Sequence, residues 1–151
     1  MKLSTKKFNL FIAFNLPSAF LCGVRLKFID DVECRVRVSY KWINRNPFKS
    51  MYCAVQGMAA ELSTGALIIS KIKKLKRNIS MLVIRSEAHF TKKARGKILF
   101  ECKQGSDIDD VLKKVIESGQ TQTILLEAYG HDNYGNQVSN FSFEWTLKLK
   151  S

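Results

Sequence analysis

The sequence has few of the residues that build metal sites and disulfide frameworks. It contains two histidines, His89 and His131, and its four cysteines are widely spaced with no C-x-x-C pair. This pattern argues against a structural zinc site and against disulfide bonds. We therefore expect no metal, no cofactor, and reduced thiols in a cytoplasmic protein.

Acidic residues are also scarce, with 13 against 25 basic residues and a net charge of +12. Such an excess favours an anionic partner, which could be nucleic acid, acidic lipid or a polyphosphorylated small molecule. The basic residues gather in KIKKLKR at 71–77 and TKKARGK at 91–97. Neither run is interleaved with aromatic residues, and no nucleic-acid reader motif occurs. A basic nucleic-acid-binding protein is therefore the weaker alternative, and we expect no nucleic-acid partner.

The N-terminal region contains an uncharged run at 8–24 that follows a basic start. Asn9, Asn15 and Pro17 interrupt this run, and no A-x-A cleavage site follows it. The run is also shorter than the roughly 20 apolar residues that a membrane span needs. We predict an N-terminal helix within residues 1–20 that ends near Pro17 and no membrane span, with an export signal as the alternative.

Hydrophobic periodicity predicts one domain over residues 1–151 with six strands and two further helices. Val32–Tyr40 alternates strictly between apolar and polar residues, which is typical of a half-buried strand, and it pairs with Val24–Ile29 through the Asp30-Asp31 turn. The other predicted strands form two hairpins, 78–90 with 97–102 and 121–129 with 138–149. The predicted helices are 51–70 and 107–117.

The central helix 51–70 decides the fold class. It contains no Lys, no Arg and no carboxylate other than Glu61. A helix that is apolar on all sides needs burial on all sides, so the sheet must curve around it. The sequence therefore predicts an α+β hotdog fold, a curved six-stranded antiparallel sheet wrapped around a long central helix.

Glu61 is the main candidate functional residue. A carboxylate is costly to bury unless it is paired, hydrogen-bonded or used for chemistry. Its neighbours Gly57, Ala60 and Gly65 are small and leave room for a ligand or another backbone. The alternative is a polar interface residue that is hydrogen-bonded to a partner strand.

Three segments resemble the hotdog thioesterase superfamily, especially a poorly characterised thioesterase-like subfamily known as a domain of unknown function. The first is Asn44-Arg45-Asn46-Pro47, with Ser50 to Ala54 leading into the helix. The second is Ala59 to Gly65, which is similar to the family's small-small-acid segment with its catalytic carboxylate. The third is Phe90 to Lys97, similar to the place where relatives carry basic residues near coenzyme A.

The resemblance implies a thioester hydrolase, an acyl-CoA thioesterase with Glu61 as general base or nucleophile. Asn46 would orient the carboxylate or the water, and amides near Tyr52 and Cys53 at the helix start would form an oxyanion hole. The substrate-binding residues would be Arg45, Ala54, Gly57, Phe90, Lys92, Lys93 and Arg95.

The chain departs from the family at the helix start. Many relatives have His-Gly-Gly where this chain has Tyr52-Cys53-Ala54. Tyr52 cannot act as a base near neutral pH, so any role of its hydroxyl is positioning. A hotdog protein that binds an acyl ligand without hydrolysing it is therefore the alternative function. Cys53 is either a small packing residue or a nucleophile, and we favour the first.

Helix geometry predicts an oligomer. Cys53 and Glu61 are eight residues apart, roughly 12 Å along one helix, so one chain cannot place both around the same carbonyl. Two antiparallel helices across a twofold axis can, which predicts a homodimer or a tetramer built from dimers. The partner would be an acyl-CoA or an acyl carrier protein thioester, with Phe14, Met58 and Phe90 as candidates to line a pocket for the acyl chain.

Overall fold

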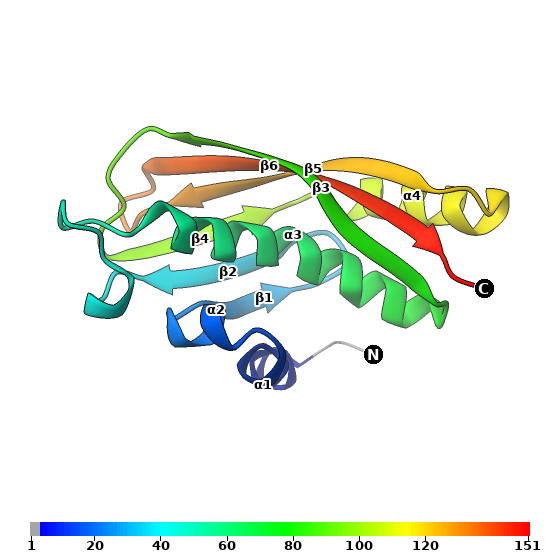
Figure 1. The fold of residues 1–151 in the computed structure, drawn as a ribbon, viewed down its shortest axis with the longest axis horizontal. Coiled ribbons are helices and arrows are strands. Elements are labelled where there is room, and N and C mark those ends of the chain that lie inside the picture. Colours follow the sequence, from blue (N-terminus) through cyan, green and yellow to red (C-terminus); the bar gives the residue numbers. More distant parts are fainter. Residues whose placement is uncertain (1–3) are drawn as a thin grey trace.

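The structure, a computed structural model, describes residues 4–151, so the first three residues of the predicted N-terminal helix lie outside the described residues. Within that range the chain forms one six-stranded antiparallel sheet that curves around a long helix (Figure 1). This confirms the predicted α+β hotdog fold. The strand order is β1-β2-β4-β5-β6-β3, with β1 at Arg25–Ile29, β2 at Cys34–Ser39, β3 at Ile79–Phe90, β4 at Lys97–Cys102, β5 at Gln122–His131 and β6 at Gln137–Leu149.

The central helix α3 (Cys53–Leu75) starts two residues later and ends five residues later than predicted. It continues through the basic segment because Lys71 is buried and its ammonium group pairs with both carboxylate oxygens of Asp109, at 2.8 and 2.7 Å. Asp109 belongs to α4 (Gly105–Ser118), so this ion pair joins the two helices. Among the described helices α3 has the length and composition of a membrane span, but two thirds of that stretch is buried inside this fold.

Two buried hydrogen bonds fix α3 against the C-terminal strand β6. The Trp145 indole N–H donates to Thr64 Oγ1 at 3.0 Å, and the Ser139 hydroxyl donates to Gln56 Oε1 at 2.8 Å. A Cβ atom at Gly65 would lie 3.3 Å from the Trp145 ring, so glycine permits the close approach of helix and strand. These contacts set both the rotation of α3 about its axis and its position along the sheet.

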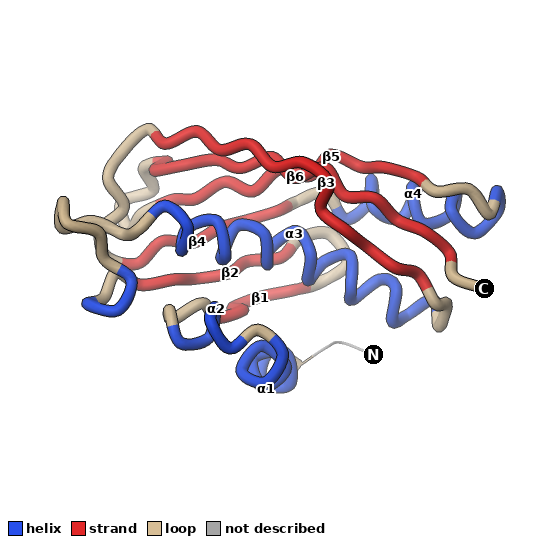
Figure 2. The backbone as a smooth tube through the Cα atoms, in the orientation of Figure 1, coloured by secondary structure: helices blue, strands red, loops and turns tan. Residues whose placement is uncertain are grey.

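The predicted hairpin between 78–90 and 97–102 is wrong. The long strand β3 pairs with β6 over its whole length and forms one edge of the sheet, while β4 lies in the interior between β2 and β5. Strand length explains why β3 pairs with β6. These strands have 12 and 13 residues, so β6 can pair with all of β3, whereas β4 has only six residues. The segment between β3 and β4 therefore crosses one end of the molecule instead of making a tight turn (Figure 2).

The N-terminal region forms two short helices, α1 (Thr5–Asn15) and α2 (Pro17–Leu21), where one helix was predicted. Pro17 starts α2 instead of ending the helical region, because proline fits the first turn of a helix, where its missing N–H costs nothing. The Asn9 amide donates to the Leu26 carbonyl at 3.0 Å and accepts from the Leu26 N–H at 2.8 Å. Asn9 thereby occupies hydrogen-bonding groups on the edge strand β1, which protects this edge from pairing with another strand.

Candidate functional site

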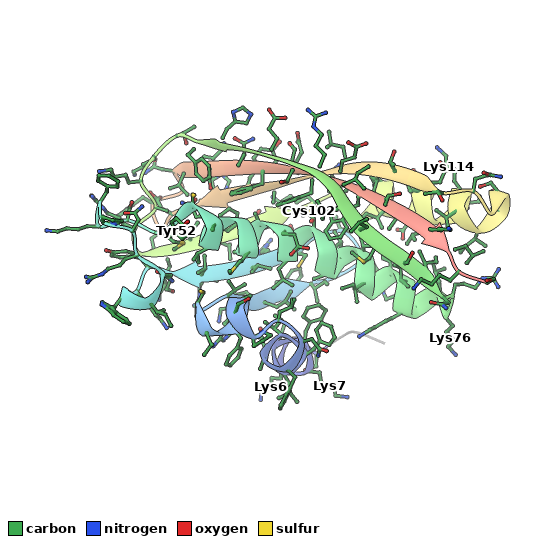
Figure 3. The ribbon with its side chains drawn as sticks, viewed as in Figure 1. Lys6, Lys7, Tyr52, Lys76, Cys102 and Lys114 are labelled. Atoms are coloured by element: carbon green, nitrogen blue, oxygen red, sulfur yellow. The ribbon has the colours of Figure 1, made fainter. Side chains whose placement is uncertain are left out.

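An open cleft of about 590 Å³ lies at the N-terminal end of α3. Three segments meet there: the loop before α3, the first turns of α3, and the end of β3 with the loop that follows. Figure 3 labels Tyr52 at this end of the helix. The lining residues are Asn46, Pro47, Phe48, Ser50, Met51, Tyr52, Cys53, Gln56, Phe90, Thr91, Lys92, Lys93 and Ala94. The cleft therefore brings together Asn46, Tyr52, Cys53, Phe90, Lys92 and Lys93 from the set proposed on sequence.

The backbone at the start of α3 presents two free donors. The Met51 N–H donates to the Ala94 carbonyl and the Tyr52 N–H donates to the Asn44 carbonyl, both at 2.8 Å. The next two amides, of Cys53 and Ala54, have no acceptor within residues 4–151. These amides lie at the positive end of the helix dipole, so they can bind an anion or a polarised carbonyl oxygen. The N–H of Tyr52 itself is used by the scaffold.

Asn44 fixes the position of this helix start. It lies in η1, a short 3-10 helix (Trp42–Asn44) that was not predicted, and its side chain is almost completely buried. Its amide donates to the carbonyls of Cys22 and Ser39, both at 2.9 Å, and accepts from the Lys41 N–H at 2.8 Å. The residue thus joins α2, β2 and the start of α3. Sequence reasoning missed this role because the two asparagines of Asn-Arg-Asn-Pro are alike in chemistry and differ only in what surrounds them.

Asn46 lies in the cleft wall, but its side chain bonds within its own loop. Its Oδ1 accepts from the Phe48 N–H at 2.9 Å and from the Ser50 N–H at 3.3 Å, and its Nδ2 donates to the Ser50 hydroxyl at 3.0 Å. These bonds hold the loop shape that carries Pro47 and Phe48 to the mouth of the cleft. The role of Asn46 toward a carboxylate or water stays a prediction.

Gln56 is a cleft residue that sequence reasoning missed. It is 3% exposed, and its Oε1 accepts from Ser139 while its Nε2 has no acceptor within residues 4–151. An amide donor that reaches a cleft and has no protein partner is available to a ligand. The available signal was a polar residue one turn after Tyr52 in an otherwise apolar helix.

Glu61 lies further along α3, where the face that packs against β6 meets the side that the sheet leaves open, and its side chain is half-buried. A Cβ atom at Gly57 would lie 3.5 Å from the Phe141 ring, and one at Gly65 would lie 3.3 Å from the Trp145 ring and 3.7 Å from Glu61 Oε1. The carboxylate therefore lies between two glycines on a face that meets aromatic rings, and it has no hydrogen-bond or ion-pair partner in the described chain. Burial in these apolar surroundings raises the pKa of Glu61 above that of an ordinary glutamate.

One chain does not bring Glu61 to the cleft. The carboxylate is not among the cleft-lining residues, and it lies roughly 12 Å from Cys53 along the helix axis. Between them, Ala54 is exposed and Gly57 and Met58 are half-buried. The side of α3 that carries these residues is thus the part of the helix that the sheet of its own chain leaves open.

The basic residues assigned to a phosphate-bearing ligand have different surroundings. Lys92 pairs with Asp132 at 3.0 Å, and this hydrogen bond lowers the pKa of the aspartate. Lys93 lies in the cleft wall with its ammonium 5.9 Å from the centroid of the Phe48 ring. Arg95 donates through Nε to the Lys49 carbonyl at 3.0 Å, and Arg45 is exposed; neither lines the cleft. Of the two lysines in the cleft wall, Lys93 is therefore the one without a carboxylate partner in the described chain.

The structure also bears on a metal site and on the residues expected to line a pocket for an acyl chain. In the part of the chain that the structure describes, no three side chains of His, Cys, Asp or Glu lie close enough to hold a metal ion. Phe14 is exposed on α1 and does not line the cleft, whereas Phe90 does. An acyl chain in this cleft would meet Phe90, Phe48 and Met51.

The chain belongs to a family described as a domain of unknown function, DUF4442, whose model matches residues 4–147. Solved structures share the fold. A Pseudomonas aeruginosa protein of unknown function, described as a probable thioesterase, is 22% identical with a TM-score of 0.87, and the match covers 99% of each chain. A Chlorobaculum tepidum protein of unknown function is 14% identical with a TM-score of 0.83, covering 97% of this chain and 94% of that one.

A Haemophilus influenzae thioesterase is 9% identical with a TM-score of 0.74, covering 99% of this chain and 93% of that one. No curated protein shows significant similarity to this chain. The likeness shows that the chain shares the hotdog fold of these structures, as the sequence predicted. At these identities it establishes the fold and leaves the substrate and the roles of individual residues to argument.

The raised pKa of Glu61 predicts a pH-dependent cost in stability. Below the pKa of glutamate in the unfolded chain, about 4.3, Glu61 is protonated in both the folded and the unfolded state, so its ionisation does not change the free energy of unfolding. As pH rises toward the folded-state pKa, ionisation favours the unfolded chain, and stability is lost. Glu61→Gln should therefore melt at a higher temperature than wild type at pH 7 to 8, and the difference should shrink toward zero near pH 4.

Calorimetric melting across this pH range is the measurement. Glu144→Gln, which changes a partly buried glutamate on β6, is the matched control for the loss of one negative charge. A Glu61→Gln protein that is less stable than wild type at pH 7 would mean that the carboxylate has a stabilising partner, and would contradict the prediction.

Proposed function

We propose that the protein hydrolyses an acyl thioester of coenzyme A or acyl carrier protein in the cleft at the start of α3. The observation that supports this most directly is that three donors at this end of α3 have no acceptor in the described chain: the Cys53 and Ala54 amides and the Gln56 side chain, of which Cys53 and Gln56 line the cleft. A thioester carbonyl develops negative charge on oxygen during attack, and donors fixed beforehand stabilise that charge without reorganising. The thioesterase described among the similar structures supports the reaction class.

The attacking group in this proposal is Glu61 of a second chain. Its raised pKa suits a general base near neutral pH, because the carboxylate then holds a proton more readily than an ordinary glutamate. As base it takes a proton from water while the water oxygen bonds to the carbonyl carbon; the C–S bond then breaks and the thiol leaves with a proton. As nucleophile it would form an acyl anhydride that water hydrolyses.

The edge strand β3 supports a dimer that would bring this residue in. In residues 4–151 β3 pairs only with β6, so its other edge has free backbone groups over 12 residues. Leu82 is 63% exposed and Ile84 is 51% exposed on this strand. A long edge strand with apolar side chains pairs readily with another strand, and a twofold axis beside it would set the open side of each α3 against the other chain.

The basic residues around the cleft fit the phosphates of coenzyme A. Lys93 lies in the wall, and Arg45, Lys92 and Arg95 are exposed near the loops that form the cleft. Charge-assisted hydrogen bonds from such side chains to phosphate would anchor the carrier outside while the thioester enters the cleft. The cytoplasmic location, the carrier and the choice of dimer or tetramer stay predictions.

A binding protein without turnover is the second candidate. The observation that favours it is Tyr52, whose exposed hydroxyl stands where many relatives have histidine and which supplies no base at neutral pH. In that case the cleft would hold an acyl ligand and the dimer would form, with no release of thiol.

Thiol release from a panel of acyl-CoA esters, from short to long and including an aryl ester, tests the proposal. Wild type should release free thiol, and Glu61→Gln should be slower by about 100-fold or more, the usual contribution of a general base. Glu144→Gln should retain wild-type rates. Equal rates for Glu61→Gln and wild type would refute the mechanism, and absence of release with saturable ligand binding would favour the binding protein.

Gln56 is expected to contribute to the rate through its free amide. Gln56→Met keeps the shape of the side chain and removes the donor, and kcat should fall about 100-fold, as for loss of one oxyanion donor. Because Gln56 also accepts from Ser139, the variant Ser139→Ala is the control: it removes the supporting bond and keeps the donor. A Gln56→Met enzyme with wild-type kcat would exclude the amide from the site.

The dimer is tested through β3. Leu82→Lys/Ile84→Lys should place four like charges along the paired edges, so the protein should sediment as a monomer and thiol release should fall at least about tenfold, since each cleft then lacks the partner's carboxylate. Leu125→Lys, on the exposed side of β5, is the matched control and should leave the mass and the rate unchanged. A Leu82→Lys/Ile84→Lys protein that remains dimeric would place the interface elsewhere.

A further inference from the structure

The outer face of α1 is apolar and faces away from the fold. Successive residues of an α-helix are about 100° apart around its axis. On this basis one arc of about 100° around α1 holds, in order, Lys6, Leu10, Phe14 and Lys7. Leu10 is 60% exposed and Phe14 is 78% exposed. The opposite side of the helix carries Phe8 and Ile12, both fully buried against the rest of the protein. The helix thus has two apolar faces, and only one of them is used by the fold.

The exposed apolar face continues onto α2. Leu21 on α2 is 66% exposed and Leu16 between the two helices is 37% exposed. We call Leu10, Phe14, Leu16 and Leu21 the N-terminal apolar surface. An exposed apolar surface of this kind on a folded protein marks a place of contact with another molecule or a membrane.

The segment that carries this surface has charge of one sign. Residues 1–29, which include α1 and α2, contain five basic residues and no Asp or Glu. Lys6 and Lys7 project from α1 away from the body of the protein in Figure 3. A twofold contact between two copies of this face would bring these lysines toward like charges, which disfavours self-association here.

An anionic lipid bilayer matches both properties of the face. Leu and Phe side chains enter the boundary between headgroups and acyl chains, and lysines beside them meet lipid phosphates. We propose that α1 and α2 dock this protein on the surface of an anionic membrane, with Leu10 and Phe14 inserted and Lys6 and Lys7 on the headgroups. This is contact with one face of a bilayer and involves no spanning segment.

Co-sedimentation of the full chain with vesicles tests the proposal. Vesicles of phosphatidylcholine mixed with phosphatidylglycerol should bind the wild-type protein, and vesicles of phosphatidylcholine alone should bind it at least about tenfold more weakly. Lys6→Glu/Lys7→Glu and, separately, Leu10→Gln/Phe14→Gln should each reduce binding to the anionic vesicles at least about tenfold.

Matched controls separate this face from the net charge of the protein. Lys113→Glu/Lys114→Glu makes the same change in charge on α4, which lies on another side of the molecule, where Figure 3 labels Lys114. Leu125→Gln removes an exposed leucine from the sheet. Both controls should bind vesicles like wild type. Circular dichroism and thiol release from a soluble acyl-CoA, unchanged in every variant, would show that the fold and the cleft are intact.

Three outcomes would overturn the proposal. Equal binding of wild type to neutral and anionic vesicles would exclude recognition by charge. The control on α4 could lose as much binding as Lys6→Glu/Lys7→Glu, which would reduce the effect to net charge. Finally, Leu10→Gln/Phe14→Gln could change the sedimenting mass without changing vesicle binding, which would make the face a contact between proteins.

Discussion

The burial of α3 is the constraint on which the rest of the structure depends. This helix carries apolar side chains around its whole circumference, and a single sheet can cover it only by curving. The hydrogen bonds from Trp145 to Thr64 and from Ser139 to Gln56 then fix which side of α3 faces the sheet. Because those contacts set the rotation of the helix, they also leave Ala54, Met58 and Glu61 on the side of α3 that borders β6 and that the sheet does not fully cover.

The same constraint explains why the candidate site divides into two parts. The start of α3 must reach past the edge of the sheet to leave its first amides free, and the β3–β4 crossing and the Asn44 hydrogen bonds hold it there. The carboxylate must lie deeper, among apolar groups, to have a raised pKa. Because α3 is straight, the Glu61 carboxylate cannot reach the free amides at the start of the same helix. An assembly of two chains is the simplest way for such a helix to place a donor pair and a carboxylate around one ligand.

The sequence predicted the fold class because the fold follows from local patterns: the strict alternation around Val36 and the absence of charged residues other than Glu61 from residues 51–70. It failed where the answer depends on partners far along the chain. Nothing local tells β3 to pair with β6 instead of the nearby β4, and nothing local extends α3 past Lys71, whose partner Asp109 is 38 residues away.

Some residues of the candidate site could likewise be predicted from local sequence, and others could not. Cys53 and Phe90 could be placed in one cleft from motif order, because the helix start and the strand end are themselves recognisable. The separate roles of Asn44 and Asn46 could not, since they depend on which carbonyls surround each amide. Gln56 could be recognised only as a polar exception in an apolar helix; its free amide is a property of the folded cleft.

The β3 edge and the outer face of α1 are both apolar and exposed in the described part of the chain, and their charges distinguish the partners that they suit. The β3 edge carries both signs, with Glu87 near Arg85 at 3.6 Å and near His89 at 3.3 Å. An antiparallel copy of such a strand can place opposite charges face to face, which favours pairing with itself. The face of α1 carries Lys6 and Lys7 and no acid, so a second copy would repel it while an anionic surface would attract it. Since apolar area alone does not select a partner, the distribution of charge supports our proposals that the first surface binds another copy of this chain and that the second binds lipid.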